Sequence, residues 1–329
     1  MAKASCRPSS VRCRCRPVVD EFNHQPVLRD EVLLALALQP EGIYVDATFG
    51  RGGHAQLILD RLSPDGRLLA LDRDPQAVAA AKRKFAHEER FTIVRGPFSM
   101  LAQTVNDRGW SGKVAGILLD LGVSSPQLDE ARRGFSFRHD GPLDMRMDPD
   151  SGISAAQWLV EADEKEIARV IRDYGEDRFA RSIARIICME RVRLAITTTS
   201  RLAEIVSQAV PTREIGQHPA TRTFQALRIH INRELEELQA VLPQAMQVLA
   251  PGGRLVAISF HSLEDRIVKQ FMRDEAKGDH FPPDLPVRQD QMHPRLKLVG
   301  KAIRASAQEC AHNPRARSAV MRVAEVLYA

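Results

Sequence analysis

The sequence predicts an α/β protein with a doubly wound, mostly parallel sheet and an inserted helical domain. Short apolar runs alternate with helical patterns between Gly42 and Leu121. The first of these runs leads into a glycine-rich turn, and the alternation stops near residue 125 and resumes near residue 223. Strands that alternate with helices form parallel sheets, because each helix carries the chain back to the same edge.

The first half of the sheet is expected to hold four strands, each followed by a crossover. The strands are predicted over Ile43–Ala47, Leu68–Asp72, Phe91–Arg95 and Ile117–Leu121. The helices are predicted over His54–Leu62, Pro75–Ala86 and Ser99–Asp107. Asp74 and Pro75 are typical of the N-cap and the first helical position, so they fix the start of the second helix.

The insertion is predicted from turn sequences and helical patterns with no clear strand. Its helices are expected over Ala155–Ile171, Phe179–Glu190 and Arg201–Ala209. About a hundred residues suffice for a separate domain. The sheet is then completed by four elements. A helix is expected over Thr223–Leu249 and a strand over Arg254–Phe260, followed by a helix that begins at Ser262 and a last strand over Ala319–Val326. We therefore divide the chain into a disordered basic tail (1–23), a ligand-binding domain (24–124 and 223–329) and a helical domain (125–222).

Composition narrows the class of protein. The chain has 329 residues and contains no run of eighteen apolar residues, so we expect no membrane span. The five cysteines form neither a disulfide framework nor a paired zinc motif, which favours a reducing, cytoplasmic compartment and no metal; they are Cys6, Cys13, Cys15, Cys188 and Cys310. The tail has no apolar signal-peptide core. It faintly resembles an organellar presequence, and a disordered extension is the simpler interpretation.

The glycine-rich turn after the first strand predicts a nucleoside-containing ligand. Gly50-x-Gly52-x-x-Ala55 satisfies the dinucleotide fingerprint, in which glycine lets the ligand approach the backbone. Asp72 ends the next strand twenty residues after Gly52, the spacing at which a carboxylate reaches ribose hydroxyls. A ligand-free turn and a loop carboxylate beside Arg73 are the structural alternatives.

A third strand tip carries the residue expected to meet the substrate. Asp120 ends the fourth strand and is followed by a tight Gly/Ser/Pro turn. Ligands of doubly wound sheets bind beyond the carboxyl ends of the strands, where Asp46 and Asp72 also lie. The alternative is a plain strand–loop junction capped by serines.

Nine segments together resemble the ribosomal RNA small-subunit methyltransferase H (MraW) family. The resemblance spans residue 24 to the C-terminus, and it rests on Asp46–His54, Leu71–Ala77, Gly96–Phe98, Leu118–Asp129, Arg133–Phe137, Asp140–Met147, His218–Gln225, Ile258–Arg266 and Asn313–Ser318. It implies a Rossmann-like class I methyltransferase sheet. The implied activity is transfer of a methyl group from S-adenosyl-L-methionine to N4 of a cytidine in the decoding region of 16S rRNA, within the small ribosomal subunit.

The resemblance also implies which residues hold the cofactor: Gly52, Gly53, His54, Asp72, Phe98, Asp120 and Gln127. Asp120 is in addition the expected catalytic residue, because an acceptor for an N4–H would help a poorly nucleophilic amine. A carbonyl of the Leu121–Ser125 turn is the alternative acceptor. Asp46 is a further candidate, for the cofactor's ammonium group. Phe135 or Phe137 would stack on the base, although both suit a packing role better.

Charge is distributed unevenly along the chain. Residues 288–329 carry eight Lys or Arg against three Asp or Glu, within a net charge of +5 for the whole chain. Such a segment suits a phosphate backbone or an ordinary solvated face. The Asn313–Ser318 turn is the preferred RNA-backbone site, whereas the arginines of the Thr223–Leu249 helix accompany apolar residues at core spacing and suit a structural role.

Two short segments near the strand ends and turns have local interpretations. Ser259, His261 and Asp265 invite a hydrolase triad, which we reject because neighbours along one turn rarely form one. Ser262 and Asp265 are instead expected to form a capping box. Asp144 and Arg146 should form a local ion pair.

The rival functions are a nicotinamide-dependent dehydrogenase and a non-catalytic RNA-binding factor. The oligomeric state is left open, with a homodimer as one possibility.

Overall fold

A single mixed sheet organises the larger part of the molecule. The computed structural model describes residues 25–210, 218–279 and 292–327. Eight strands pair in the order β3-β2-β1-β4-β5-β8-β6, with β7 on β8. They are β1 (Ile43–Asp46), β2 (Arg67–Asp72), β3 (Phe91–Arg95), β4 (Val114–Asp120), β5 (Leu249–Ser259), β6 (Leu296–Leu298), β7 (Ile303–Arg304) and β8 (Val320–Val326). Strands β1 to β5 are parallel and β8 is antiparallel to β5, β6 and β7.

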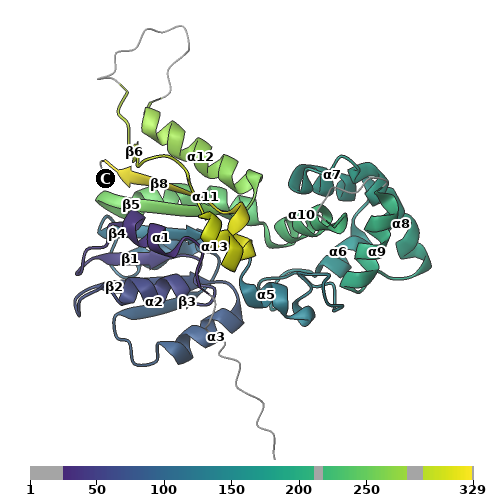
Figure 1. Cartoon of the computed structure of the whole chain (residues 1–329), viewed down its shortest axis with the longest axis horizontal. Helices are drawn as coiled ribbons and strands as arrows, with labels where there is room; N and C mark the ends of the chain where they lie inside the picture. Colours follow the sequence, from purple (N-terminus) through teal and green to yellow (C-terminus); the bar gives the residue numbers. More distant parts are fainter. Residues whose placement is uncertain (1–24, 211–217, 280–291, 328–329) are drawn as a thin grey trace, which may run out of the picture.

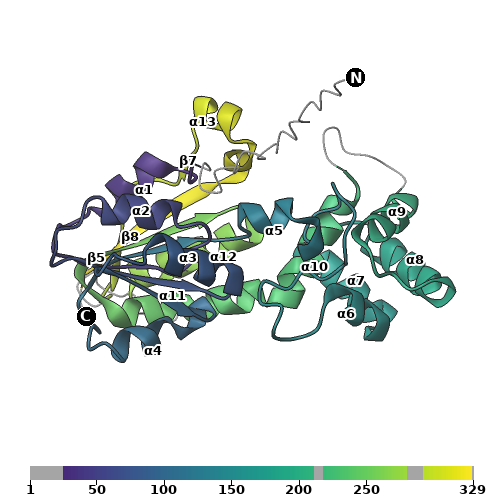
Figure 2. The ribbon, with the colours of Figure 1, turned by 90° about the horizontal axis from the view of Figure 1, so that it is seen from below.

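Alternate residues of each buried strand face two separate cores. In β1, Tyr44 belongs to one core and Val45 to the other, and in β4 Leu118 and Leu119 divide in the same way. The first core is covered by α1 (Arg29–Leu36), α2 (Gly53–Leu59) and α3 (Pro75–Lys84). The second is covered by α4 (Leu101–Asn106), α11 (Glu234–Val248) and α12 (Ser262–Lys277). Figure 2 shows α1 and α2 on one side of the sheet and α4 and α11 on the other. The predicted doubly wound sheet is therefore confirmed.

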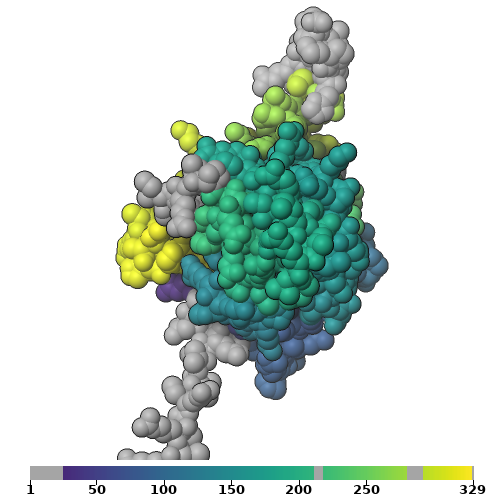
Figure 3. All heavy atoms as spheres, turned by 90° about the vertical axis from the view of Figure 1, so that its right-hand side faces the viewer, coloured from purple at the N-terminus to yellow at the C-terminus, as the bar shows by residue number. Residues whose placement is uncertain are grey.

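The helical unit forms a third core beside the sheet (Figure 1). The chain enters it through α5 (Ser125–Asp129) and η2 (Ala131–Arg133). Its main helices are α6 (Ala155–Glu161), α7 (Glu164–Gly175), α8 (Ala180–Arg193), α9 (Thr199–Ala209) and α10 (Ala220–Asn232). In a view onto this end, the helical unit hides most of the sheet (Figure 3).

Two of the predicted helices are wrong in extent, each for a local reason. The helix expected over Ala155–Ile171 is two helices, because the side chain of Asp163 caps a new helix by accepting from the Glu166 N–H. The helix expected over Thr223–Leu249 breaks at Arg233, whose φ of 52° is left-handed. Helix α10 belongs to the helical core through Phe224 and Leu227. We therefore propose Arg233, rather than residue 222, as the boundary of the helical domain.

The predicted strands agree with β1 to β4 and β8 within a few residues. Strand β5 begins at Leu249, earlier than expected, and β6 and β7 were not predicted because two or three residues carry no periodicity. Helix α13 (Ala307–His312) and η4 (Pro314–Ser318) lead into β8. The predicted tail (1–23), with Cys6, Cys13 and Cys15, and also Arg288 lie outside the described residues.

Within the described part of the chain, none of the helices is both long and apolar enough to cross a bilayer.

Candidate active site

A cavity of about 400 Å³ lies where the carboxyl ends of the strands meet α10. We call its two parts the cofactor half and the acceptor half. The cofactor half is lined by the β1–α2 turn and the ends of β2 and β3, with Gly50, Gly53, His54, Asp72 and Phe98. The acceptor half is lined by α10, the end of β5 and η4, with Gln225, Arg228, Phe260, His261 and Arg315. Asp120 lines the boundary, because β4 lies between β1 and β5 in the sheet.

Three aspartate side chains lie at the C-terminal ends of neighbouring strands. Asp46, Asp72 and Asp120 are the last residues of β1, β2 and β4, and β1 pairs with both of the other strands. The Asp120 N–H donates to Oγ1 of Thr48 at 2.6 Å, which ties the two strand ends together. The Oδ1 atom of Asp120 is buried and has no hydrogen-bond partner among the described residues. A buried, unused acceptor in a cavity is a position for a ligand donor.

The electrostatics of this cluster favour a cationic ligand. Burial, with a smaller contribution from the nearby charge of Asp72, raises the pKa of Asp46 to about 7. Burial also raises the pKa of Asp72 to about 6. Burial, with Asp46 and Glu264 as neighbouring charges, raises the pKa of Asp120 well above its usual range. A bound positive charge would offset the cost of burying these negative charges next to one another, and it would favour the ionised carboxylates.

The β1–α2 turn depends on glycine for two different reasons. Gly50 has a φ of +55° and its N–H donates to Oδ2 of Asp72 at 2.7 Å, which joins the turn to β2. Gly52 has a φ of +66°, and a Cβ there would lie 2.4 Å from the ring of Phe49. The turn therefore requires glycine at both positions, but only Gly50 lines the cavity.

His54 is a neutral group in the cofactor half. Its side chain is only 6% exposed, and burial lowers its pKa to about 4. Its Nε2 lies 3.6 Å from Oδ2 of Asp120, which is too long for a hydrogen bond. The uncharged ring thus fills the space beside Asp120 without neutralising it.

Gln127 braces the turn that follows Asp120. Its Oε1 accepts from the Ser124 N–H at 2.9 Å and its Nε2 donates to Oδ2 of Asp74 at 3.0 Å. The same Asp74 oxygen accepts from Nη1 of Arg133 at 2.6 Å, in a pair whose side chains are 7% and 5% exposed. Gln127 therefore lines the cavity from a buried network that holds α5 against α3.

The acceptor half offers an aromatic ring and two arginines. Phe260 follows β5 and lies against the turn after β4, since a Cβ on Gly122 would be 3.5 Å from its ring. Arg315 of η4 donates to Oγ of Ser125 and, at 2.9 Å, to Oδ1 of Asp129. Arg228 of α10 pairs with Glu234. These residues come from segments far apart in the chain.

Comparison with known proteins decides the family. The model of the MraW methylase family matches residues 21–327. The chain belongs to the MraW methylase family. A relative from Thioalkalivibrio sulfidiphilus, named Ribosomal RNA small subunit methyltransferase H, is 58% identical over 92% of this chain and 97% of its own. One of the same name from Thiobacillus denitrificans is 60% identical over 92% and 96%. Among solved structures, a putative rRNA methylase from Clostridium thermocellum covers 91% of this chain and 94% of its own, with 12% identity and a TM-score of 0.42.

Membership in the MraW methylase family confirms three predictions from the sequence. The resemblance is confirmed over nearly the whole chain, and so is the class I methyltransferase sheet. The chain is a methyltransferase, with S-adenosylmethionine as its cofactor, which excludes the nicotinamide-dependent dehydrogenase. The cavity suits this cofactor, because the carboxylates of Asp72 and Asp120 line it and can face a ligand with an ammonium and a sulfonium charge.

The structure brings together most of the site residues predicted for the methylase. Gly53, His54, Asp72, Phe98, Asp120 and Gln127 all line the cavity. Gly52 is the exception: it is buried behind Phe49 and does not line it. Both Asp72 oxygens accept backbone N–H bonds, from Gly50 and Asp74, so Asp72 also fixes the glycine-rich turn, a role that the sequence did not indicate.

Phe135 and Phe137 have the packing role that the sequence favoured. Phe135 is buried in the helical core and the ring centroids of Phe137 and Phe224 lie 4.8 Å apart, so neither lines the cavity, whereas Phe260 does. The signal for Phe260 was its place directly after a strand end. The capping box of α12 is formed by His261 and Glu264, one residue earlier than expected.

Two local expectations outside the cavity are confirmed. Asp265 pairs with Arg322 at 2.7 Å, which supports the rejection of a hydrolase triad. The Asp144–Arg146 ion pair is present at 2.8 Å.

Proposed function

We propose that this methylase transfers a methyl group to N4 of a cytidine in the decoding region of 16S rRNA, within the small ribosomal subunit. The observation that carries the proposal is the position of Asp120, a partly buried carboxylate whose buried Oδ1 has no partner among the described residues, at the boundary between the two halves of the cavity. Relatives at 58% and 60% identity are named small-subunit rRNA methyltransferases. An rRNA substrate places the enzyme in the cytoplasm.

In this proposal the cofactor half holds S-adenosylmethionine. Asp72 accepts from the ribose hydroxyls with the lone pairs that its two backbone bonds leave free, and Phe98 flanks the adenine. Gly53 and His54 border the methionine end. Asp46 is buried and does not line the cavity, so it compensates the ammonium group through its charge from below the turn. Gln127 acts as a positioning residue for the turn after Asp120, since its amide already bonds Ser124 and Asp74.

When bound, the cofactor supplies a methyl group made electrophilic by the sulfonium. The N4 amine forms the new N–CH₃ bond as the S–CH₃ bond breaks, the electron pair of the S–CH₃ bond stays on sulfur, and the proton that the nitrogen loses passes to the carboxylate of Asp120. Before the transfer, Oδ1 of Asp120 accepts an N4–H bond, which favours a more tetrahedral nitrogen with its lone pair available for the methyl group. Holding amine and methyl group in line contributes about 7–11 kcal/mol to lowering the barrier.

The acceptor half receives the cytidine. A base must leave its stack to reach a buried carboxylate, and an aromatic side chain stabilises an unstacked base by about 1–3 kcal/mol. Phe260 is the aromatic residue in position for this role, beside the Gly122 turn. The Asn313–Ser318 turn remains the proposed contact to the RNA backbone, with Arg315 at the cavity and Arg317 exposed beside it.

The proposal is tested by locating the methyl group. Small subunits that lack the modification are incubated with the enzyme and S-adenosylmethionine carrying a deuterated methyl group, and the nucleosides are analysed by mass spectrometry. The expected product is labelled N4-methylcytidine at one position of the decoding region. A label on another nucleoside, or binding of the subunit with no label in the RNA, would exclude the proposed activity. The second outcome would favour a non-catalytic binding factor.

A further inference from the structure

Arg228 is held rigidly in the acceptor half by an unusual arrangement of charges. Its Nε and Nη2 donate to the two carboxylate oxygens of Glu234, each at 2.9 Å. The side chains of Arg228 and Glu234 are only 15% and 8% exposed. A bidentate pair of this kind fixes the plane of the guanidinium as well as its position.

The left-handed residue Arg233 creates this pair. In a continuous helix, residues six positions apart do not share a face. The break between α10 and α11 instead turns Glu234 back toward Arg228. Gln225, one turn before Arg228 on α10, also lines the cavity. Gln225 and Arg228 therefore present one face of α10 to the active site.

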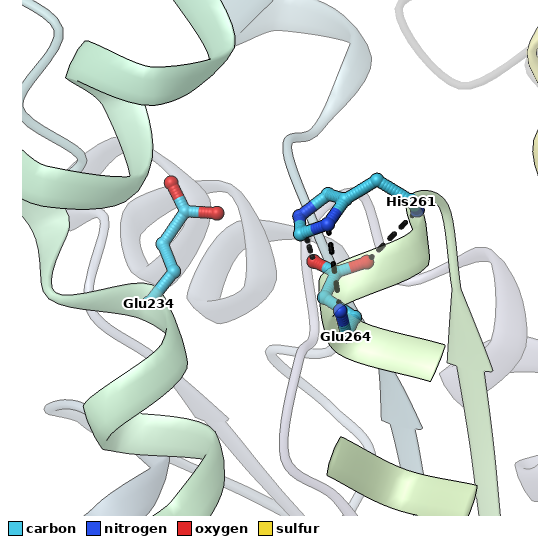
Figure 4. A group of neighbouring side chains, drawn as sticks. All are labelled: Glu234, His261 and Glu264. Carbon is cyan, nitrogen blue, oxygen red and sulfur yellow. Dashed lines mark hydrogen bonds and ion pairs between the residues drawn. The ribbon is translucent and has the colours of Figure 1, made fainter. Parts of the chain in front are cut away.

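The neighbouring acidic groups act on Arg228 and leave little capacity for a metal ion. Figure 4 shows Glu234 facing His261 and Glu264, and their ligand atoms lie within 4.8 Å of one another. Both oxygens of Glu234 already accept from Arg228, and Oε2 of Glu264 accepts from the Phe260 N–H at 2.8 Å. The cation that this cluster holds is thus the guanidinium itself.

One edge of the guanidinium is left for a ligand. Its Nη1 carries two N–H groups, and no acceptor among the described residues is bonded to them. Arg228 lines the same cavity as Asp120. The acceptor half therefore presents a donor edge at Arg228 and an acceptor at Oδ1 of Asp120.

We propose that Arg228 reads the cytosine edge of the substrate by donating to O2 and N3 while Asp120 accepts from N4. This inference rests on the proposed function and adds the basis of its base selectivity. Cytosine presents acceptors at O2 and N3 and a donor at N4. Uracil instead has an N3–H, which would face the arginine donors. A site whose buried groups are left unpaired by the wrong base rejects it strongly.

Replacing single atoms of the target base tests the inference. Target RNA containing cytidine is compared with RNA in which that residue is 3-deazacytidine, which keeps the N4 amine but lacks the N3 acceptor. Loss of one charge-assisted hydrogen bond should lower kcat/KM about 10- to 100-fold in the wild-type enzyme. In Arg228→Lys, which keeps the positive charge beside Glu234 but loses the planar fork, the two RNAs should differ less than about 3-fold.

Arg222→Lys is the matched control, because Arg222 lies on the same helix but does not line the cavity. This control should retain the wild-type discrimination. Equal loss of discrimination in both variants, or an unchanged ratio in Arg228→Lys, would overturn the role of Arg228. If Arg228→Lys fails to fold, as judged by its Tm, the wild-type comparison decides: indifference to the N3 atom overturns the inference. Absence of methylation on cytidine RNA by the wild-type enzyme would instead refute the proposed function.

Discussion

The two halves of the cavity differ in how the chain builds them. The cofactor half comes mainly from residues 47–98, in which consecutive strand ends and their turns converge on one edge of the sheet. The acceptor half combines α10, the end of β5 and η4, so it brings together residues from 225 to 318. Because the cofactor half comes from one short stretch of the chain, its residues can be predicted from the sequence. The second half exists only once the helical unit has packed beside the sheet.

Asp120 stands between the halves, and its substitution separates chemistry from binding. Asp120→Asn keeps the size of the side chain but weakens the acceptor for the N4–H. We expect kcat to fall about 100- to 1000-fold, as for other single groups that stabilise a transition state. S-adenosylhomocysteine affinity, measured by calorimetry, should change only a few-fold.

Asp72→Asn is the contrasting variant, in the cofactor half. It should weaken S-adenosylhomocysteine binding and leave kcat at saturating cofactor closer to the wild-type value. A wild-type kcat in Asp120→Asn would contradict the catalytic role of Asp120 and, with it, the division of the cavity into a binding half and a half where the methyl group is transferred.

Gly52→Ala probes the framework of the cofactor half. The new Cβ would lie 2.4 Å from the Phe49 ring at a φ of +66°. We expect a loss of stability of about 2–4 kcal/mol, from collision as well as backbone strain. Gly109→Ala is the control, because Gly109 has a φ of +67° and nothing within 4 Å of its Cβ position.

Strain alone should cost Gly109→Ala about 1–2 kcal/mol. Equal losses in the two variants, measured by urea unfolding, would remove the steric account of Gly52.

Phe260→Leu tests the acceptor half in isolation. Loss of an aromatic face should reduce kcat/KM for the target RNA by about 10-fold, since stacking contributes about 1–3 kcal/mol per base. Cofactor affinity should stay unchanged. Phe271→Leu on α12, which packs in the sheet core instead of the cavity, is the matched control. A drop in cofactor affinity with normal RNA kinetics would assign Phe260 to the other half.

The carboxyl cluster predicts a pH dependence of cofactor binding. The native-state pKa values of Asp46 and Asp72 are raised, to about 7 and about 6. Raised carboxyl pKa values mean that the ligand-free protein loses stability as pH rises from about 4 to 7. A ligand with an ammonium group favours the ionised carboxylates, so its affinity should rise in the same range.

We expect S-adenosylhomocysteine to bind about 10-fold more tightly at pH 8 than at pH 5. Adenosine, which lacks the ammonium group, should show a smaller change, and Asp46→Asn should flatten the profile. Tighter binding at pH 5 would show that the cluster does not select a cation.

The same contrast explains how much of the molecule could be predicted. Local sequence patterns predict the alternation of strands and helices and the acidic strand ends at Asp72 and Asp120. The folded structure keeps both features. The break at Arg233 could not be predicted, because no local sequence pattern indicates an arginine in a left-handed conformation. The interaction that accompanies this strained conformation is the Arg228–Glu234 ion pair, which forms only in the folded protein. Gly52 was assigned to the ligand, since the fingerprint does not reveal that Phe49 occupies the space beside it.

The central claim is that cofactor and cytidine share this one cavity and meet at Asp120. A bisubstrate compound that joins the 5′ carbon of adenosine to N4 of cytidine through a short linker tests it directly by calorimetry. The account predicts binding at least 100-fold tighter than adenosine, weakened by Asp72→Asn in the cofactor half and by Arg228→Lys in the acceptor half. Affinity no greater than that of adenosine, or no effect of Arg228→Lys, would contradict it and place the cytidine elsewhere on the molecule.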